Sequence, residues 1–287
     1  MNNLWEKAPF GIATGGLTTE QLNTKLPFSV GGISRQGLDH IHMGVPNQDA
    51  VNIIIQDDFI IGVVADGCTS NNENSVDSFS SNQVGAQLLA KLIGNLCCEN
   101  ISPRKNRINK TKFLHWLSEQ TLQRLEKILD IMRFSDKERK QFSYQTLTAT
   151  VIGFIIRREE FFLFHCGDGI VQSNQNSYNL SSHSGSYLSK WIDRDTPPVV
   201  FNKITEGKTK DLSHLYIATD GFLQGNLLKS EVFQEMLHNE NQSQKGFVDL
   251  IPEFHMEVLD NWEEMETNAW PGDDSSMIMV RRKKQST

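Results

Sequence analysis

Two apolar runs in this 287-residue chain end on the same dipeptide, Asp-Gly. The first is GVVADG at residues 62–67, and the second is YIATDG at residues 216–221. An isolated Asp-Gly usually marks a turn, because both residues tolerate the backbone angles that turns require. The repetition of this ending on two strand-like runs predicts instead that the two carboxylates belong to one shared site.

The strand-like runs come in pairs. Residues 50–55 and 59–65 are separated by QDD, and residues 148–156 and 161–166 are separated by RREE. Short polar turns between apolar runs predict two antiparallel hairpins. Two further strands are expected later in the chain, at 214–219 and 276–282.

Two helices are expected between the strands, at 83–96 and 113–132. Their apolar residues recur at spacings of three and four, which gives each helix one apolar face. Polar stretches without periodicity predict loops at 68–82 and 97–110. Sheets built from hairpins and covered by helices indicate a layered α+β architecture rather than an alternating parallel sheet.

Hairpin geometry predicts where the acidic residues lie. In an antiparallel pair the start of one strand lies beside the end of the other. Asp49 comes just before the first strand and Asp66 ends the second, so both are expected at one edge of the sheet. Asp168 and Asp220 also end strands, and Asp273 and its neighbour Asp274 begin the last one. We therefore expect these carboxylates to converge.

A cluster of carboxylates needs positive charge. Two like charges 4 Å apart repel by about 4 kcal/mol at an effective dielectric constant of 20. Oxygen ligands without His or Cys suit hard octahedral ions, so Mg²⁺ or Mn²⁺ is expected rather than zinc. Gly67 and Gly221 allow the backbone to approach closely, which makes a glycine carbonyl a further candidate ligand.

The composition narrows the class of protein. A net charge of -7 disfavours nucleic acid as a partner, because binding through phosphates needs a basic surface. No apolar run approaches the roughly 18 residues that span a membrane. The first residues lack the pattern of a secretory signal, and the four cysteines form no CxxC pair. We therefore expect a cytoplasmic protein that binds neither nucleic acid nor membrane.

Six short motifs follow one another in order: NQDA, VVADG, TLTATVIGF, HCGDGIV, YIATDGF and GDDSSMIMV. Each is weak alone, but the ordered set resembles the type 2C, metal-dependent (PPM) protein serine/threonine phosphatases. The first motif, GVPNQDA at 44–50, is most similar to their bacterial branch. The resemblance covers residues 28–281 and leaves an N-terminal extension at 1–27 and a basic tail at 282–287.

The resemblance implies a fold and an activity. The fold is an α+β, four-layer sandwich of two antiparallel β-sheets flanked by α-helices. The activity is hydrolysis of phosphoserine and phosphothreonine in proteins by a water that bridges two Mn²⁺ or Mg²⁺ ions. The implied partner is a phosphoprotein in bacterial signalling, either a kinase or the target of a kinase.

The resemblance also assigns metal ligands to matching positions. Asp66 bridges both ions, the Gly67 carbonyl binds one, and Asp220 and Asp273 hold the other. Asp273 fits the family motif better than its neighbour, because of its spacing from the last apolar strand.

Further implied roles fall on Asp49 and Asp168. Asp49 orients the attacking water, and Asp168 with Asp220 holds a third, more weakly bound ion. Many family members carry a histidine after the first Asp-Gly that protonates the leaving group. Cys68 stands there in this chain, so no general acid is assigned.

The phosphate-binding arginine of the family is also missing, because its position falls at Gly44. Arg35 and His40 are the nearest candidates for phosphate binding, with a solvated arginine and a loop histidine as the alternatives. His40 and His42 would share one face of an extended segment, which is typical of a metal site, but surface histidines are the preferred interpretation.

Two other functions remain as alternatives. One is a catalytically silent member of the PPM fold that acts as a binding or sensing module. The other is a two-metal nuclease or a hydrolase of small phosphate esters. The acid cluster disfavours the silent module, because it is unfavourable without cations. The acidic composition and the lack of a basic, aromatic patch disfavour the nuclease.

Overall fold

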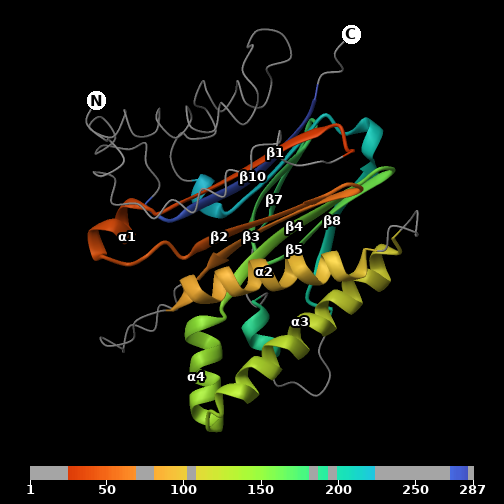
Figure 1. The fold of residues 1–287 in the computed structure, drawn as a ribbon. Helices are drawn as coiled ribbons and strands as arrows, with labels where there is room; N and C mark the ends of the chain where they lie inside the picture. Colours follow the sequence, from red (N-terminus) through yellow and green to blue (C-terminus); the bar gives the residue numbers. More distant parts are fainter. Residues whose placement is uncertain are drawn as a thin grey trace.

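The computed structural model describes residues 25–68, 81–101, 108–180, 187–192, 199–223 and 272–283. These residues form two five-stranded antiparallel sheets (Figure 1). Sheet A has the order β1-β10-β9-β6-β7. Its strands are β1 Phe28–Arg35, β6 Gly169–Ser173, β7 Asn176–Leu180, β9 His214–Ala218 and β10 Ser275–Arg282. Sheet B has the order β2-β3-β4-β5-β8. Its strands are β2 Asp49–Gln56, β3 Phe59–Gly67, β4 Ala149–Arg157, β5 Glu160–Cys166 and β8 Asn202–Lys208.

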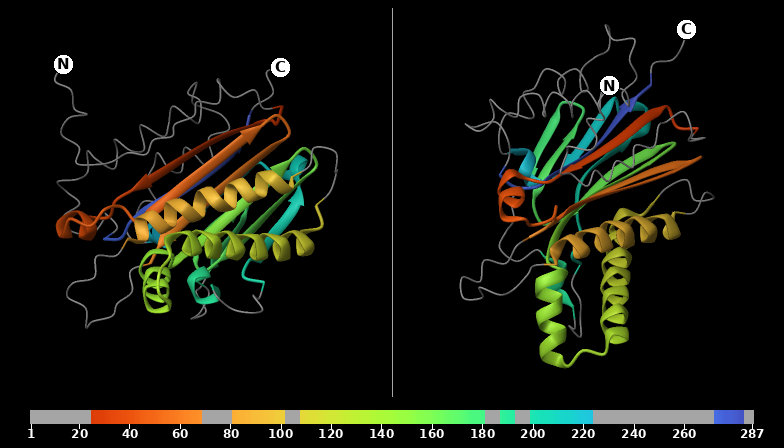
Figure 2. Two further views of the ribbon diagram at one scale, coloured as in Figure 1. Left: turned by 60° about the horizontal axis from the view of Figure 1, so that its bottom comes forward. Right: turned by 60° about the vertical axis from the view of Figure 1, so that its left-hand side comes forward.

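The helices of the described residues lie mostly on one side of this sandwich. They are α1 Leu38–Met43, α2 Asn82–Asn100, α3 Lys110–Met132, α4 Asp136–Thr146 and the short 3-10 helices η3 Leu188–Trp191, η4 Thr209–Asp211 and η5 Asp220–Leu223. Helix α2 packs against β2 and β3, and α3 contacts α2 and diverges from it toward α4 (Figure 2, right). Both expected long helices are confirmed, although α2 continues four residues into the stretch expected as a loop. Cys97 is buried against the sheet, so its packing extends the helix.

Two apolar cores separate the layers. In β3, Ile61, Val63 and Ala65 pack toward the helices, whereas Ile60 and Val64 pack toward sheet A. Residues on both faces of this strand are therefore buried, which explains its uninterrupted apolar sequence. The result is the predicted α+β sandwich. The helical layer expected over the outer face of sheet A falls outside the described residues.

Both predicted hairpins are present. β2 pairs with β3 and β4 pairs with β5, and both pairs are antiparallel. The last strand, β10, is antiparallel to β9, as expected. The sequence patterns did not reveal β1, β6, β7, β8, α1 or α4. β7 and β8 are edge strands rich in polar residues, so they lack the apolar pattern that identifies a strand.

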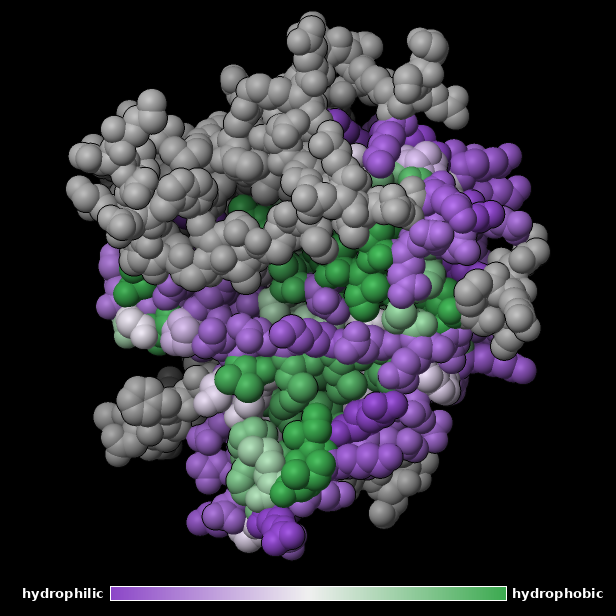
Figure 3. Space-filling model, viewed as in Figure 1, coloured by the Kyte–Doolittle hydropathy of each residue, from purple (hydrophilic) through white to green (hydrophobic). Residues whose placement is uncertain are grey.

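Apolar surface remains visible on the helical side of the molecule. In the space-filling view, hydrophobic residues gather between α3 and α4, below the polar band along α2 (Figure 3). Phe134, just after α3, and Phe142, on α4, are half-buried and pack together with ring centroids 5.1 Å apart. None of the described helices has the length and hydropathy needed to cross a bilayer.

Candidate metal and phosphate site

The site is built around the end of β3. Asp66 lies directly opposite Asp49 in the β2–β3 ladder, as the hairpin predicted. Gly67 ends the strand in a crowded position, where a Cβ atom would lie 2.8 Å from the carbonyl oxygens of Gln48 and Asn82. Because such contacts are too short for any side chain, only glycine allows the chain to continue from Asp66 at this point.

Three further carboxylates reach the same end of the sandwich from other elements. Asp220 begins η5 just after β9, and Asp273 lies just before β10. Asp168 lies in the turn between β5 and β6. The glycines on either side of it have φ angles of +103° (Gly167) and +126° (Gly169). Those angles favour glycine, so the turn that carries Asp168 depends on both of them.

A cleft of about 410 Å³ brings these residues together. Its described lining residues are Asp39, His40, Met43, Gln48, Asp66, Gly67, Cys68, Asp168, Tyr187, Asp220, Gly272 and Asp273. All five residues expected to bind metal are in this set. Asp49 lies behind Asp66, where it is 4 % exposed.

The carboxylates interact strongly with one another. Burial, followed by the charges of Asp220, Asp273 and Asp168, raises the pKa of Asp66. Burial and then the charge of Asp66 raise the pKa of Asp49. The pKa values of Asp220 and Asp273 are also raised, with burial as the main cause. These groups resist simultaneous ionisation without a compensating cation.

The donor set fits a hard divalent cation. Carboxylates converge on the cleft, and Gly67 places its backbone at the edge of it. Such oxygen ligands are those that Mg²⁺ and Mn²⁺ prefer. The carboxylates of Asp66, Asp168, Asp220 and Asp273, with the Gly67 carbonyl, are therefore groups that could hold such ions.

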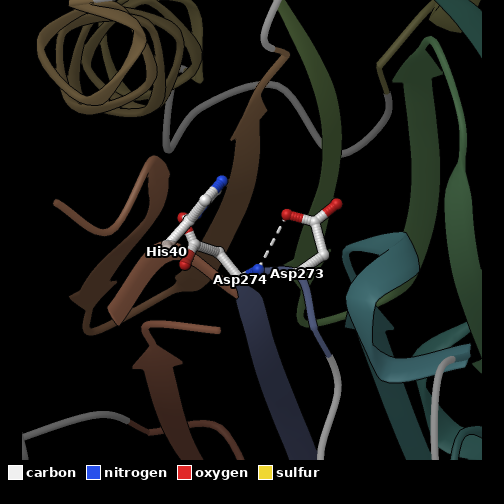
Figure 4. A group of neighbouring side chains, drawn as sticks. All are labelled: His40, Asp273 and Asp274. Carbon is white, nitrogen blue, oxygen red and sulfur yellow. Dashed lines mark hydrogen bonds and ion pairs between the residues drawn. The ribbon is translucent and has the colours of Figure 1, made fainter. Parts of the chain in front are cut away.

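Asp273 and Asp274 have different surroundings. The Asp274 carboxylate accepts hydrogen bonds from the backbone N–H groups of Gly37, at 2.7 Å, and Gln48, at 2.5 Å. Its Oδ2 atom also lies 2.8 Å from Nδ1 of His40. The Asp273 side chain accepts from the backbone N–H of Asp274 (Figure 4), and one of its carboxylate oxygens lies within 4.8 Å of a ring nitrogen of His40 and a carboxylate oxygen of Asp274. Asp274 thus holds the loop before β2, and Asp273 faces the cleft.

The two candidate phosphate-binding residues occupy different places. His40 is on helix α1 and lines the cleft, so its interpretation as a surface histidine is wrong. His42 is exposed on the same helix. The extended geometry considered for this pair is also wrong, because the segment is helical. Arg35 ends β1 beside Ser275, is buried rather than solvated and is not among the described residues that line the cleft.

Sequence patterns missed two contributors to the site. Thr219 donates a 2.7 Å hydrogen bond to Asp49, and its position directly before Asp220 was the available signal. Tyr187 lines the cleft and forms a hydrogen bond with Cys68. No local pattern marks Tyr187, which reaches the cleft only through the tertiary fold.

The two antiparallel sheets and the acid-lined cleft at their edge are the architecture that the motif series implied. The profile of the protein phosphatase 2C family matches residues 36–263. The chain therefore belongs to the protein phosphatase 2C family. No curated protein matches it in a sequence comparison.

Solved structures of bacterial phosphatases share the fold. A bacterial serine phosphatase is similar with a TM-score of 0.54 at 12% identity, covering 91% of this chain and 100% of that one. The serine/threonine phosphatase Stp1 from Staphylococcus aureus gives 0.53 at 13% identity, covering 92% and 97%. The serine/threonine phosphatase of S. agalactiae gives 0.54 at 14% identity, covering 89% and 100%. At these identities the likeness shows the fold alone.

Proposed function

We propose that this chain is a Mn²⁺- or Mg²⁺-dependent phosphatase that removes phosphate from phosphoserine and phosphothreonine in cytoplasmic proteins. The observation that carries the proposal is the convergence of Asp66, Asp168, Asp220 and Asp273 on one cleft. The phosphoprotein substrate is a kinase or the target of a kinase. The phosphatase domain spans residues 28–281, in keeping with a first strand that begins at Phe28.

Each residue has a proposed role in this reaction. Two bound divalent ions supply a nucleophile at neutral pH and stabilise the charge that develops on the phosphoryl group. Asp66, Asp220, Asp273 and the Gly67 carbonyl hold them. Asp49 is fixed by the hydrogen bond from Thr219, so it presents a stationary carboxylate beside Asp66 that orients the attacking water.

Asp168 is proposed to serve a third ion. After burial, the charge of Asp168 is the next cause that raises the pKa of Asp220, which places the two carboxylates close together. Replacing Asp168 with Ala should slow turnover while calorimetry still detects two Mn²⁺ ions. Loss of all Mn²⁺ binding would place Asp168 among the primary ligands instead.

The alternative is a catalytically silent binding or sensing module. One assay separates the two functions: hydrolysis of a phosphothreonine peptide in EDTA, Mg²⁺ or Mn²⁺. We expect turnover only with metal, and Asp66→Asn should abolish it. The matched control is Asp57→Asn, at an exposed carboxylate in the β2–β3 turn that pairs with Lys25 at 3.3 Å. Absence of turnover with any metal would favour the silent module.

A further inference from the structure

The charge of the cleft poses a problem for a phosphorylated substrate. Five of its described lining residues are aspartates, and a phosphomonoester is itself an anion. Bound cations offset part of this repulsion, and a side chain that donates hydrogen bonds to the phosphoryl oxygens offsets more of it. Among the described residues that line the cleft, His40 is the only basic one.

The position of His40 is fixed by a buried carboxylate. Its Nδ1 atom lies 2.8 Å from Oδ2 of Asp274, and the two side chains are 12% and 2% exposed. The carboxylate is in turn anchored by the backbone N–H groups of Gly37 and Gln48, which flank α1 and the loop that follows it. This ion-pair contact favours an orientation of the imidazole ring in which Nδ1 faces Asp274.

This orientation leaves the second ring nitrogen for a ligand. With Nδ1 engaged by Asp274, the Nε2 atom lies on the opposite side of the ring, and Figure 4 shows that side pointing away from the carboxylate. Hydrogen bonding of the ring to the Asp274 carboxylate is the main cause that raises the pKa of His40, so the protonated ring is favoured. A protonated ring donates from both nitrogens, one to Asp274 and one to the cleft.

Arg35, the other candidate, is less suited to this task. It is 8% exposed at the end of β1, and burial lowers the pKa of its guanidinium to about 8. Its place in the ladder opposite Ser275 makes it part of sheet A.

We propose that His40, positioned by Asp274, binds the phosphoryl oxygens of the phosphomonoester substrate and so fills the role left open by Gly44. The inference rests on the proposed phosphatase function and adds the residue that recognises the phosphate. Asp274 acts as a positioning residue, because it reaches the substrate only through His40.

The test compares His40→Gln with His42→Gln, a matched change on the same helix at an exposed position. The readouts are KM for a phosphothreonine peptide, inhibition by inorganic phosphate, and Mn²⁺ affinity by calorimetry. Loss of one charge-assisted hydrogen bond predicts that His40→Gln raises KM and the inhibition constant of phosphate about 10- to 100-fold. Mn²⁺ affinity should stay within about twofold in the same variant. His42→Gln should match the wild type in KM, in the inhibition constant of phosphate and in Mn²⁺ affinity.

Asp274→Asn tests the positioning role. It should weaken phosphate binding in the wild-type background and have little further effect in the His40→Gln background, because the two residues act as one unit. A purely structural role for Asp274 would instead give additive losses. Circular dichroism of each variant establishes that it is folded.

Three results would overturn the inference. An unchanged inhibition constant for phosphate in His40→Gln would remove His40 from substrate binding. A loss of Mn²⁺ affinity in that variant would make His40 a metal ligand. Wild-type protein that binds no phosphate would also refute it. Phosphate binding by calorimetry keeps the inference separate from the proposed function, because it is measurable even if the chain hydrolyses no peptide.

Discussion

The Thr219 hydroxyl donates a hydrogen bond of 2.7 Å to Oδ2 of Asp49, a residue 170 positions earlier in the chain. Asp49 begins β2 in sheet B, and Thr219 follows β9 in sheet A. Thr219 also accepts a 2.9 Å hydrogen bond from the backbone N–H of Ser276 in β10. One hydroxyl therefore ties both sheets together beside the carboxylates of the cleft.

Replacing Thr219 with Val should destabilise the protein while preserving its shape. The change leaves a buried carboxylate without its donor, which predicts a loss of about 1–3 kcal/mol in the free energy of unfolding with Mn²⁺ present. Urea denaturation measures this loss. The control is Thr205→Val, a partly exposed residue on the edge strand β8, which should change stability by less than about 0.5 kcal/mol. Equal effects of the two changes would contradict the role of Thr219.

The acidic site was predictable because it depends on strands whose apolar pattern is plain. Once β2 and β3 are recognised as a hairpin, the antiparallel rule places Asp49 opposite Asp66 without further information. The same rule applies to β9 and β10, whose pairing brings Asp220 and Asp273 to one edge.

The position of His40 in the site was not predictable from strand pairing. Helix α1 has six residues and is held by tertiary contacts, such as the 3.0 Å hydrogen bond from the Asp39 N–H to the Gly272 carbonyl. Its other anchor, Asp274, lies more than two hundred residues away in the sequence. Local periodicity carries no information about such contacts, so the geometry of His40 follows only from the folded structure.

Asp273→Ala and Asp274→Ala should impair different properties of the protein, metal binding in the first and stability in the second. Asp273 faces the cleft, so its replacement should abolish both turnover and high-affinity Mn²⁺ binding with little loss of stability. Asp274 accepts backbone hydrogen bonds, so its replacement should lower the free energy of unfolding by about 1–3 kcal/mol and retain Mn²⁺ binding. Calorimetry with Mn²⁺ and urea denaturation distinguish the two. Normal Mn²⁺ affinity in Asp273→Ala together with its loss in Asp274→Ala would reverse the assignment.

The metal-free protein should become less stable as the pH rises from 5 to 7. Burial and mutual repulsion raise the folded-state pKa values of Asp49, Asp66, Asp220 and Asp273, so the folded state binds more protons than the unfolded state. The contribution of these groups to the free energy of unfolding is complete below their unfolded-state pKa of about 3.9. It is lost as the pH rises through their raised folded-state pKa values. Urea denaturation in EDTA checks this trend.

Two further measurements test whether the acid cluster causes this loss of stability with rising pH. Mn²⁺ at pH 7 should restore stability, because the ion binds the folded state and offsets the charge. Asp66→Asn in EDTA should flatten the dependence on pH, since it removes one of the interacting charges. Stability in EDTA that increases from pH 5 to pH 7 would contradict the prediction.

One stretch of the sequence suggests a cysteine-dependent mechanism in place of the metal-dependent one. HCGDGIVQ begins like the loop of cysteine-dependent phosphatases, in which a thiolate attacks phosphorus and an arginine six residues after the cysteine binds the phosphate. Six residues after Cys166 the chain has Gln172, whose amide donates to the backbone carbonyl of Asn174 at 3.1 Å. A neutral amide cannot supply the charge and the two parallel donors of a guanidinium.

The structure also gives Cys166 the wrong environment for a nucleophile. Its side chain is 1% exposed in the core between sheet B and the helices, and burial raises its pKa to about 12. A thiol in this setting stays protonated at neutral pH. We therefore expect Cys166→Ala to retain most of the metal-dependent turnover, acid quenching to trap no phosphocysteine, and EDTA to abolish activity. Hydrolysis that persists in EDTA and disappears in Cys166→Ala would replace the metal-dependent mechanism with a cysteine-dependent one.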